Sequence, residues 1–178
     1  MQGKGFIDLL DAFAEFNQTV PNAELLLIGG NIAQDIHPFQ RQFLDRVDAL
    51  GLQQKVVVTG VTDCVEKHLA VCDIFVLPSY REGVPRSLLE AMSMGLPCIA
   101  TDIRGAREII KHGEEGLLFQ PKDVPTLARL LDRLYRDSEL RTRIARNARA
   151  LAIAQYDEAG YLQKQVSAIE RFLPRAQA

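Results

Sequence analysis

Glu82 and Glu90 are the residues of this chain whose type and spacing best suit chemistry on a ligand. They stand eight positions apart, the first in a predicted turn and the second in a predicted helix that Pro85 opens. The start of a helix offers free backbone N–H groups and partial positive charge, which attract phosphate, and Ser87 adds a hydroxyl donor. A carboxylate accepts charge-assisted hydrogen bonds from vicinal hydroxyl groups. The segment therefore predicts a ligand with a diphosphate and several hydroxyl groups, as in a nucleotide-sugar.

Each of these residues also has a simpler explanation. Glu90 alone would suit an exposed helix position, although its apolar neighbours predict a half-buried one. Glu82 alone would favour the positive end of the following helix. Arg81 and Arg86 suit either solvated charges or phosphate contacts. The combination with Gly83, Pro85 and the apolar strand before them favours a ligand site.

The elements that must position this segment alternate between strand and helix patterns. Apolar runs predict buried strands at 23–30, 55–60, 74–77, 97–101 and 116–119. Helical periodicity predicts helices at 5–16, 39–50, 65–71, 86–94, 106–111, 123–136, 138–154 and 158–172. Asp123 suits the N-cap of one helix, and Asp137 or Ser138 that of the next. Strands separated by helices predict an α/β fold with a doubly wound parallel sheet, which binds ligands at its carboxyl edge.

Length predicts a single domain covering residues 1–178. The chain enters a helix at Gly5, only four residues after Met1. A doubly wound domain usually begins with a strand. We therefore expect either a chain cut just after its first strand or a true start that lies upstream.

Composition argues against several classes of function. Apolar residues make up 47% and charged residues 25%, with a net charge of −2, so no basic surface predicts binding to nucleic acid. No apolar run approaches the roughly 20 residues that cross a bilayer, and no signal peptide opens the chain, which predicts the cytoplasm. The three cysteines and three histidines lack ligand spacing, so we expect no metal site.

The segment around Glu82 and Glu90 resembles the E-x7-E signature of retaining GT-B glycosyltransferases of family GT4, the glycosyl transferase group 1 family. The matching pattern is Glu82-Gly83, Glu90-Ala91-Met92, Gly95 and Pro97. Further matches are Lys4-Gly5, Leu9, Leu10, Ala12-Phe13 and the predicted strands. The resemblance covers almost the whole chain. It implies the Rossmann-like, C-terminal half of a GT-B protein, without the first strand of that half.

The resemblance implies a role for each matching position. Lys4 would bind the donor diphosphate as a compact positive charge. Glu90 would hold the ribose, and Glu82, the candidate catalytic residue, would hold hydroxyl groups of the transferred sugar. The loop near Val61 would meet the base. The other residues expected at the sugar and phosphates are Gly83, Val84, Pro85, Arg86 and Ser87.

The implied reaction transfers a sugar from a nucleoside diphosphate, such as a UDP- or GDP-sugar, with retention at the anomeric carbon. No metal or other cofactor is expected, because Lys4 and the helix dipole carry the needed charge. Two other functions stay open: a nucleotide-sugar-binding module without catalysis, and a sugar-nucleotide epimerase that shares the GT-B architecture. For these 178 residues alone we expect donor binding without transfer.

The resemblance also predicts how this chain departs from its family. Many members have an aromatic residue and a glycine at Val84 and Pro85, so the backbone donor at Pro85 is lost. A Gly-Arg pair and the domain that binds the acceptor (a glycan, lipid or small molecule) would precede Met1, and the intact parent would be peripheral at the membrane. An inner strand would also be missing, which predicts either unpaired ladders or two strands that close up, with marginal stability or a homodimer covering the gap. A helix at 158–174 would pack towards the acceptor domain.

Overall fold

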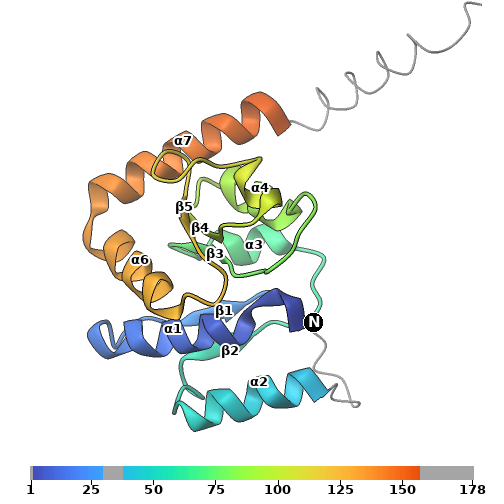
Figure 1. Cartoon of the computed structure of the whole chain (residues 1–178), viewed down its shortest axis with the longest axis vertical. Coiled ribbons are helices and arrows are strands. Elements are labelled where there is room, and N and C mark those ends of the chain that lie inside the picture. The colour runs from blue at the N-terminus through green and yellow to red at the C-terminus, as the bar shows by residue number, and fades with distance from the viewer. Residues whose placement is uncertain (1, 30–37, 157–178) are drawn as a thin grey trace, which may run out of the picture.

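The computed structural model describes residues 2–29 and 38–156, with side chains for 3–29 and 41–156 (Figure 1). The strands are β1 (Leu25–Leu27), β2 (Val56–Val58), β3 (Phe75–Leu77), β4 (Cys98–Thr101) and β5 (Leu117–Phe119). A 3₁₀ turn, η1 (Gln2–Lys4), precedes the helices α1 (Phe6–Thr19), α2 (Pro38–Ala49), α3 (Val65–Leu69), α4 (Arg86–Ser93), α5 (Arg104–Arg107), α6 (Val124–Arg136) and α7 (Ser138–Tyr156). The alternation of strands and helices is the one that the sequence predicts.

The strands form two parallel sheets. β1 pairs with β2, with Leu25 opposite Val56, and β3, β4 and β5 pair in that order, with Phe75 opposite Cys98. Within the described ranges no ladder joins β1 to β3, so each of these two strands keeps one edge without a strand partner. Of the two outcomes expected for a missing inner strand, the structure shows unpaired ladders and not closure.

Residues of β3 and β4 alternate between two hydrophobic cores, one on each face of the three-stranded sheet. Val76 and Ile99 contact the first core, whereas Leu77, Cys98 and Ala100 belong to the second. This alternation follows from the two-residue repeat of a strand. Helices α1, α2 and α6 complete the first core, and α3, α4 and α5 complete the second. Helices on both faces make the fold doubly wound, as predicted.

Helix α7 contributes to both cores. Leu140 and Ile144, near its start, pack in the first core, and Ala148 and Ala152, near its end, pack in the second. Figure 1 shows α7 lying across the end of the molecule that also holds α4. Burial of each leucine or isoleucine side chain contributes roughly 1.5–3 kcal/mol. α7 therefore ties the two layers of helices together.

The start of α5 differs from the prediction. The sequence predicts a helix at 106–111, but the helical turn begins at Arg104, two residues earlier. Ile103, directly after β4 and Asp102, has the extended conformation of an N-cap residue, with φ −116° and ψ 161°. The chain therefore turns into the helix sooner than its apolar periodicity indicates.

The later helix caps agree with the prediction. Asp123 and Asp137 each accept a hydrogen bond from a backbone N–H in the first turn of the following helix, at 3.1 and 2.8 Å. Asp137, and not Ser138, is thus the capping residue of α7. The predicted helix at 158–174 lies outside the described residues.

The fold places the start of the chain beside the carboxyl end of β3. The backbone N–H of Tyr80, just after β3, donates to the carbonyl oxygen of Gly3 in η1 at 2.7 Å. Because β3, β4 and β5 are parallel, the loops that follow them also lie at this edge. The first turn of the chain and the segment after β3 therefore meet where the ligand site was predicted.

Candidate ligand site at the carboxyl end of strand β3

The start of α4 has unsatisfied backbone donors. Pro85 is its N-cap residue, and its carbonyl oxygen accepts from the N–H groups of Leu88 and Leu89 at 3.1 and 3.4 Å. Pro85 supplies no side-chain cap, and no hydrogen bond within the described residues satisfies the N–H groups of Arg86 and Ser87. These two donors, together with the partial positive charge of the helix end, are available to an anion.

Lys4 and Glu82 form an ion pair across the site. The Lys4 Nζ donates to Glu82 Oε1 at 2.6 Å, although the two residues are 78 positions apart in the sequence. The Glu82 side chain is 19% exposed and that of Lys4 48% exposed. The sequence predicted both residues at one site but not their direct contact, because no local pattern encodes a contact between such distant positions.

The surroundings of Glu82 keep its carboxylate charged. Burial raises the pKa of Glu82, but hydrogen bonds from Lys4 and Ser79 and the positive charge of Lys4 outweigh it and lower the pKa below its ordinary value. Near neutral pH the group is therefore an acceptor only. An ionised carboxylate in a sheltered turn is suited to receive hydroxyl groups of a ligand.

Glu90 differs from the prediction of a half-buried residue. It is exposed, while Ala91 and Met92, the next two residues of α4, are fully buried. The reason is helical geometry, because successive residues of a helix point about 100° apart and only one face of α4 meets the core. The Glu90 side chain has no hydrogen-bond or ion-pair partner within the described part of the chain. Its carboxylate is therefore free to bind a ligand.

Gly105 supports the turn that carries Glu82, a contact that the sequence analysis missed. A Cβ atom built on Gly105 would collide with the carbonyl oxygen of Gly83 and lie 2.7 Å from that of Glu82. Only glycine lets α5 approach the turn so closely. The available signal was a glycine directly before a predicted short helix, a residue type that permits close backbone approach.

The remaining predicted residues lie in exposed positions. Arg81, Val84 and Arg86 are exposed around the turn, with Val84 63% exposed, and neither arginine takes part in an ion pair within the described residues. Val61, 82% exposed, follows β2. No hydrogen bond within the described residues joins Val61 to the turn after β3. The structure thus brings Lys4 and Glu82 together but leaves the place of Val61 in the site as a prediction.

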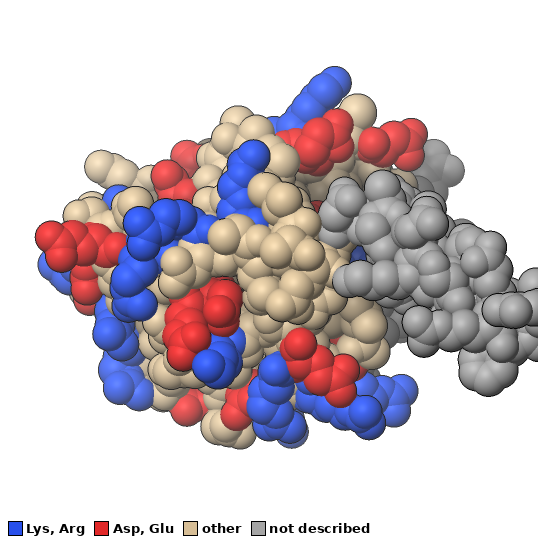
Figure 2. Space-filling model, turned by 90° about the horizontal axis from the view of Figure 1, so that it is seen from above, with Lys and Arg blue, Asp and Glu red and all other residues tan. Residues whose placement is uncertain are grey.

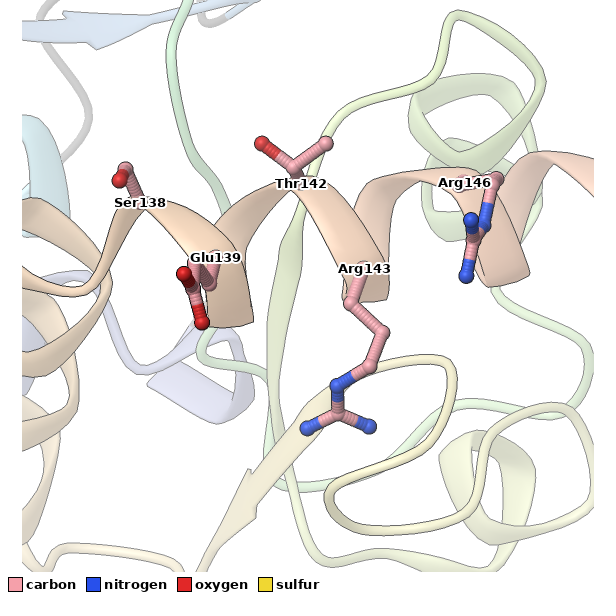
Figure 3. Close-up of a pocket in the computed structure, with 5 residues that line it drawn as sticks. All are labelled: Ser138, Glu139, Thr142, Arg143 and Arg146. Carbon is pink, nitrogen blue, oxygen red and sulfur yellow. The ribbon is translucent and has the colours of Figure 1, made fainter.

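A surface hollow elsewhere contains none of the predicted residues. It is lined by the first turns of α7, from Ser138 to Arg146 (Figure 3). Figure 3 shows the Arg143 side chain extending away from the helix, and its guanidinium donates to the carbonyl oxygen of Gly113 at 3.0 Å. Figure 2 shows acidic and basic side chains interspersed over the face seen from above. No single sign of charge dominates that face.

Neither a metal site nor a membrane-spanning helix is found within residues 2–29 and 38–156. No three His, Cys, Asp or Glu side chains gather there in a way that could hold a metal ion. Likewise, none of the helices in these ranges has the length and apolar character needed to cross a membrane.

Comparison with known proteins identifies the family. The model of the family "Glycosyl transferases group 1" matches residues 2–151. The chain is 34% identical over 149 residues to N-acetyl-alpha-D-glucosaminyl L-malate synthase of Bacillus anthracis, a match that covers 84% of this chain and 37% of that protein. The chain thus spans little more than a third of that relative's length.

Solved structures give the same fold. The crystal structure of Anabaena Alr3699/HepE in complex with UDP and glucose superposes with a TM-score of 0.88 at 27% identity, covering 96% of this chain and 45% of that one. The C-terminal domain of a glycosyl transferase group 1 family protein (LpcC) from Francisella tularensis gives a TM-score of 0.80 at 28% identity, covering 89% of this chain and 82% of that domain. The fold is therefore that of the Rossmann-like, C-terminal half of a GT-B glycosyltransferase.

Proposed function

The chain belongs to the glycosyl transferases group 1 family, and from this premise we propose that it binds the nucleotide-sugar donor of a retaining glycosyltransferase. The observation that carries the proposal is the Lys4–Glu82 pair together with the N–H groups at the start of α4, which have no partner among the described residues. Those groups can receive a diphosphate and sugar hydroxyls together. The UDP and glucose held by the Anabaena protein support a donor of this class.

The diphosphate would lie between Lys4 and the start of α4. The Lys4 ammonium has three N–H donors, and Glu82 takes one of them in the free protein. The other two remain for phosphate oxygens, alongside the N–H groups of Arg86 and Ser87. Glu82, kept ionised by the same lysine, would then accept hydroxyl groups of the transferred sugar.

The nucleoside would extend along α4. Glu90 has an exposed carboxylate without a partner in the described structure, which suits two hydrogen bonds from vicinal ribose hydroxyls. Backbone groups near Val61 would meet the base. Gly83, Val84 and Pro85 would line the sugar and phosphates through backbone atoms, with no donor from the nitrogen of Pro85.

In the intact enzyme we propose transfer with retention. The bond from the anomeric carbon to the diphosphate oxygen breaks, and the acceptor oxygen bonds to that carbon on the same face. The acceptor proton passes to the departing diphosphate. The main contribution of this chain is electrostatic stabilisation of that diphosphate, by Lys4 and the N–H groups of α4. Glu82 holds the sugar and does not attack the anomeric carbon.

The proposed donor is tested by calorimetric titration with UDP, GDP and ADP and their sugar conjugates. We expect saturable binding of one nucleotide and loss of most of that binding in Glu90→Ala. Glu15→Ala is the matched control, because Glu15 is also exposed on a helix. A folded protein that binds none of these nucleotides would contradict the proposal. Because we propose no metal requirement, EDTA should leave binding unchanged.

We further propose that these 178 residues alone bind the donor without transferring its sugar. The limited span of the chain against the Bacillus anthracis relative supports this. Incubation of the purified chain with the bound nucleotide-sugar and candidate acceptors tests it, and any transfer product would contradict it.

No observation favours an epimerase. The two described histidines, His68 and His112, each have a hydrogen bond with a backbone group, the carbonyl oxygen of Cys64 and the N–H of Leu118.

Two further expectations stay proposals. A homodimer would cover the open edges of β1 and β3. The residues of β1 are only half-buried, whereas those of β4, which has a strand partner on both sides, are all buried. This difference supports the proposal that another surface covers β1. Light scattering that shows a monomer at high concentration would contradict it. Peripheral membrane association of the intact parent, through a lipid acceptor, is tested by vesicle flotation of the parent.

A further inference from the structure

The start of the chain and the turn after β3 are in direct backbone contact. The N–H of Tyr80 donates to the Gly3 carbonyl oxygen at 2.7 Å. Gly5 has φ +64°, and a Cβ atom built there would collide with the carbonyl oxygen of Pro78. Two segments that are far apart in the sequence thus lie as close together as backbones can.

A side-chain contact reinforces this junction. The Tyr80 hydroxyl donates to Asp8 Oδ2, in the first turn of α1, at 2.5 Å. The ammonium of Lys122 lies over the Tyr80 ring, 5.9 Å from its centroid. Burial, followed by the hydrogen bond and charge of Asp8, raises the pKa of Tyr80 to about 12. Around neutral pH the phenol therefore keeps its proton and remains the donor.

The residues of the Tyr80–Asp8 contact are close in sequence to those of the Lys4–Glu82 ion pair. Tyr80 precedes Glu82 by two residues, and Asp8 follows Lys4 by four residues, across Gly5 at the start of α1. We propose that Asp8 and Tyr80 are positioning residues, which hold Lys4 opposite Glu82 and so fix the spacing between the diphosphate and sugar subsites. The role in donor binding rests on the function proposed above, whereas the effect on the ion pair does not.

The energetics of exposed ion pairs explain why such positioning is needed. Lys4 is about half exposed, and an exposed Lys–Glu pair barely offsets the rotamer entropy that both side chains lose. The pair becomes well defined only when the two backbones are already fixed relative to each other. The Tyr80–Asp8 hydrogen bond involves a charged acceptor and is therefore among the stronger ones. This hydrogen bond holds the two backbone segments that carry Lys4 and Glu82 in a fixed relative position.

The pKa of Glu82, measured by carboxyl NMR in the ligand-free chain, tests the effect on the ion pair. Glu82→Gln assigns the signal. Tyr80→Phe deletes only the hydroxyl, and Tyr135→Phe, on exposed α6 surface, is the matched control. We expect the Glu82 pKa to lie below 4.5 in the native chain and the control, and to move towards 4.5 in Tyr80→Phe. An unchanged value in folded Tyr80→Phe would overturn the proposal.

Asp8→Asn is a second variant, and the direction in which it changes the Glu82 pKa separates the positioning role from a simple charge effect. Removal of a negative charge near the site would by itself lower the Glu82 pKa further. A rise in Asp8→Asn therefore reports loss of the Lys4 contact, and a fall would contradict the positioning role. This variant decides the question even where Tyr80→Phe does not fold.

Affinity for UDP-glucose and UMP tests the consequence for the donor. We expect Tyr80→Phe to weaken UDP-glucose binding about threefold to tenfold and to leave UMP binding within about twofold, because UMP lacks the sugar that Glu82 would hold. An equal loss of affinity for UDP-glucose and for UMP would contradict the proposed role of Tyr80 in setting the spacing between the two subsites. A native chain that binds neither these ligands nor the corresponding GDP and ADP compounds would contradict the proposed function alone, while the NMR measurement would still decide the effect on the ion pair.

Discussion

The turn that carries Glu82 and the helix that carries Glu90 hold their carboxylates in opposite ways. Glu82 is held by Lys4 from the start of the chain, and its turn rests on Gly105 of α5. Glu90 stands on α4 with its side chain exposed and without a partner among the described residues. The first group is therefore positioned by tertiary contacts before a ligand arrives, whereas the second is positioned by its helix alone.

This difference predicts how substitutions near each glutamate affect stability and ligand binding. A change that moves the Glu82 turn must affect both stability and binding, because the contacts that fix the carboxylate also join separate parts of the fold. A change at Glu90 must affect binding alone.

Gly105→Val is expected to break the Glu82 region. Its side chain would collide with the carbonyl oxygen of Gly83 and crowd that of Glu82, at a cost of about 1–3 kcal/mol or more in the free energy of unfolding. Displacement of the turn should also abolish measurable donor binding. Thermal unfolding and calorimetry measure the two effects. Gly83→Ala is the control for stability, because a Cβ at Gly83 meets open space; equal melting temperatures for both variants would refute the contact.

Lys4→Met removes the cation of the Glu82 region and retains the length of the side chain. Charge-assisted hydrogen bonds contribute about 1.5–3 kcal/mol, so we expect UDP-glucose to bind about tenfold weaker or worse. Lys67→Met, at an exposed position of α3, provides the comparison and should bind as the native chain does. Titration calorimetry measures both. Native affinity in Lys4→Met would remove Lys4 from the site.

Glu90→Gln tests the region without a partner. We expect UDP and UDP-glucose to lose affinity to the same extent, about threefold to tenfold, since both carry the ribose. The melting temperature should not change, because the native side chain is exposed and makes no contact that the substitution breaks. A drop in melting temperature would show that Glu90 has a structural partner after all.

The pH dependence of stability gives the smallest effect. The folded-state pKa of Glu82 is below its ordinary value of 4.5, so the Lys4 contact stabilises the fold above about pH 4.5 and is lost as the pH falls through the folded value. Native chain and Glu82→Gln should therefore differ slightly in melting temperature at neutral pH and converge in acid. A difference that stays constant across this range would mean that the ion pair contributes nothing.

The fold was largely predictable because its signals are local. Each apolar run that predicts a strand contains one, and Asp123 and Asp137 cap the helices at which their side chains were expected to act. The half-buried environment expected for Glu90 was wrong, because neighbours in sequence point in different directions on a helix. The separation into two sheets was only one of two predicted outcomes, because strands that pair with each other come from distant segments of the chain.

Three features can be predicted from the amino-acid sequence: the α/β alternation, the two glutamates eight residues apart and the helix start between them. Those features depend on periodicity, capping and turn chemistry within short stretches of chain. Three contacts arise only in the folded molecule: Lys4 with Glu82, Gly105 with the turn, and Tyr80 with Asp8. These contacts join backbones that are distant in sequence and become neighbours only when the two hydrophobic cores pack against the sheet.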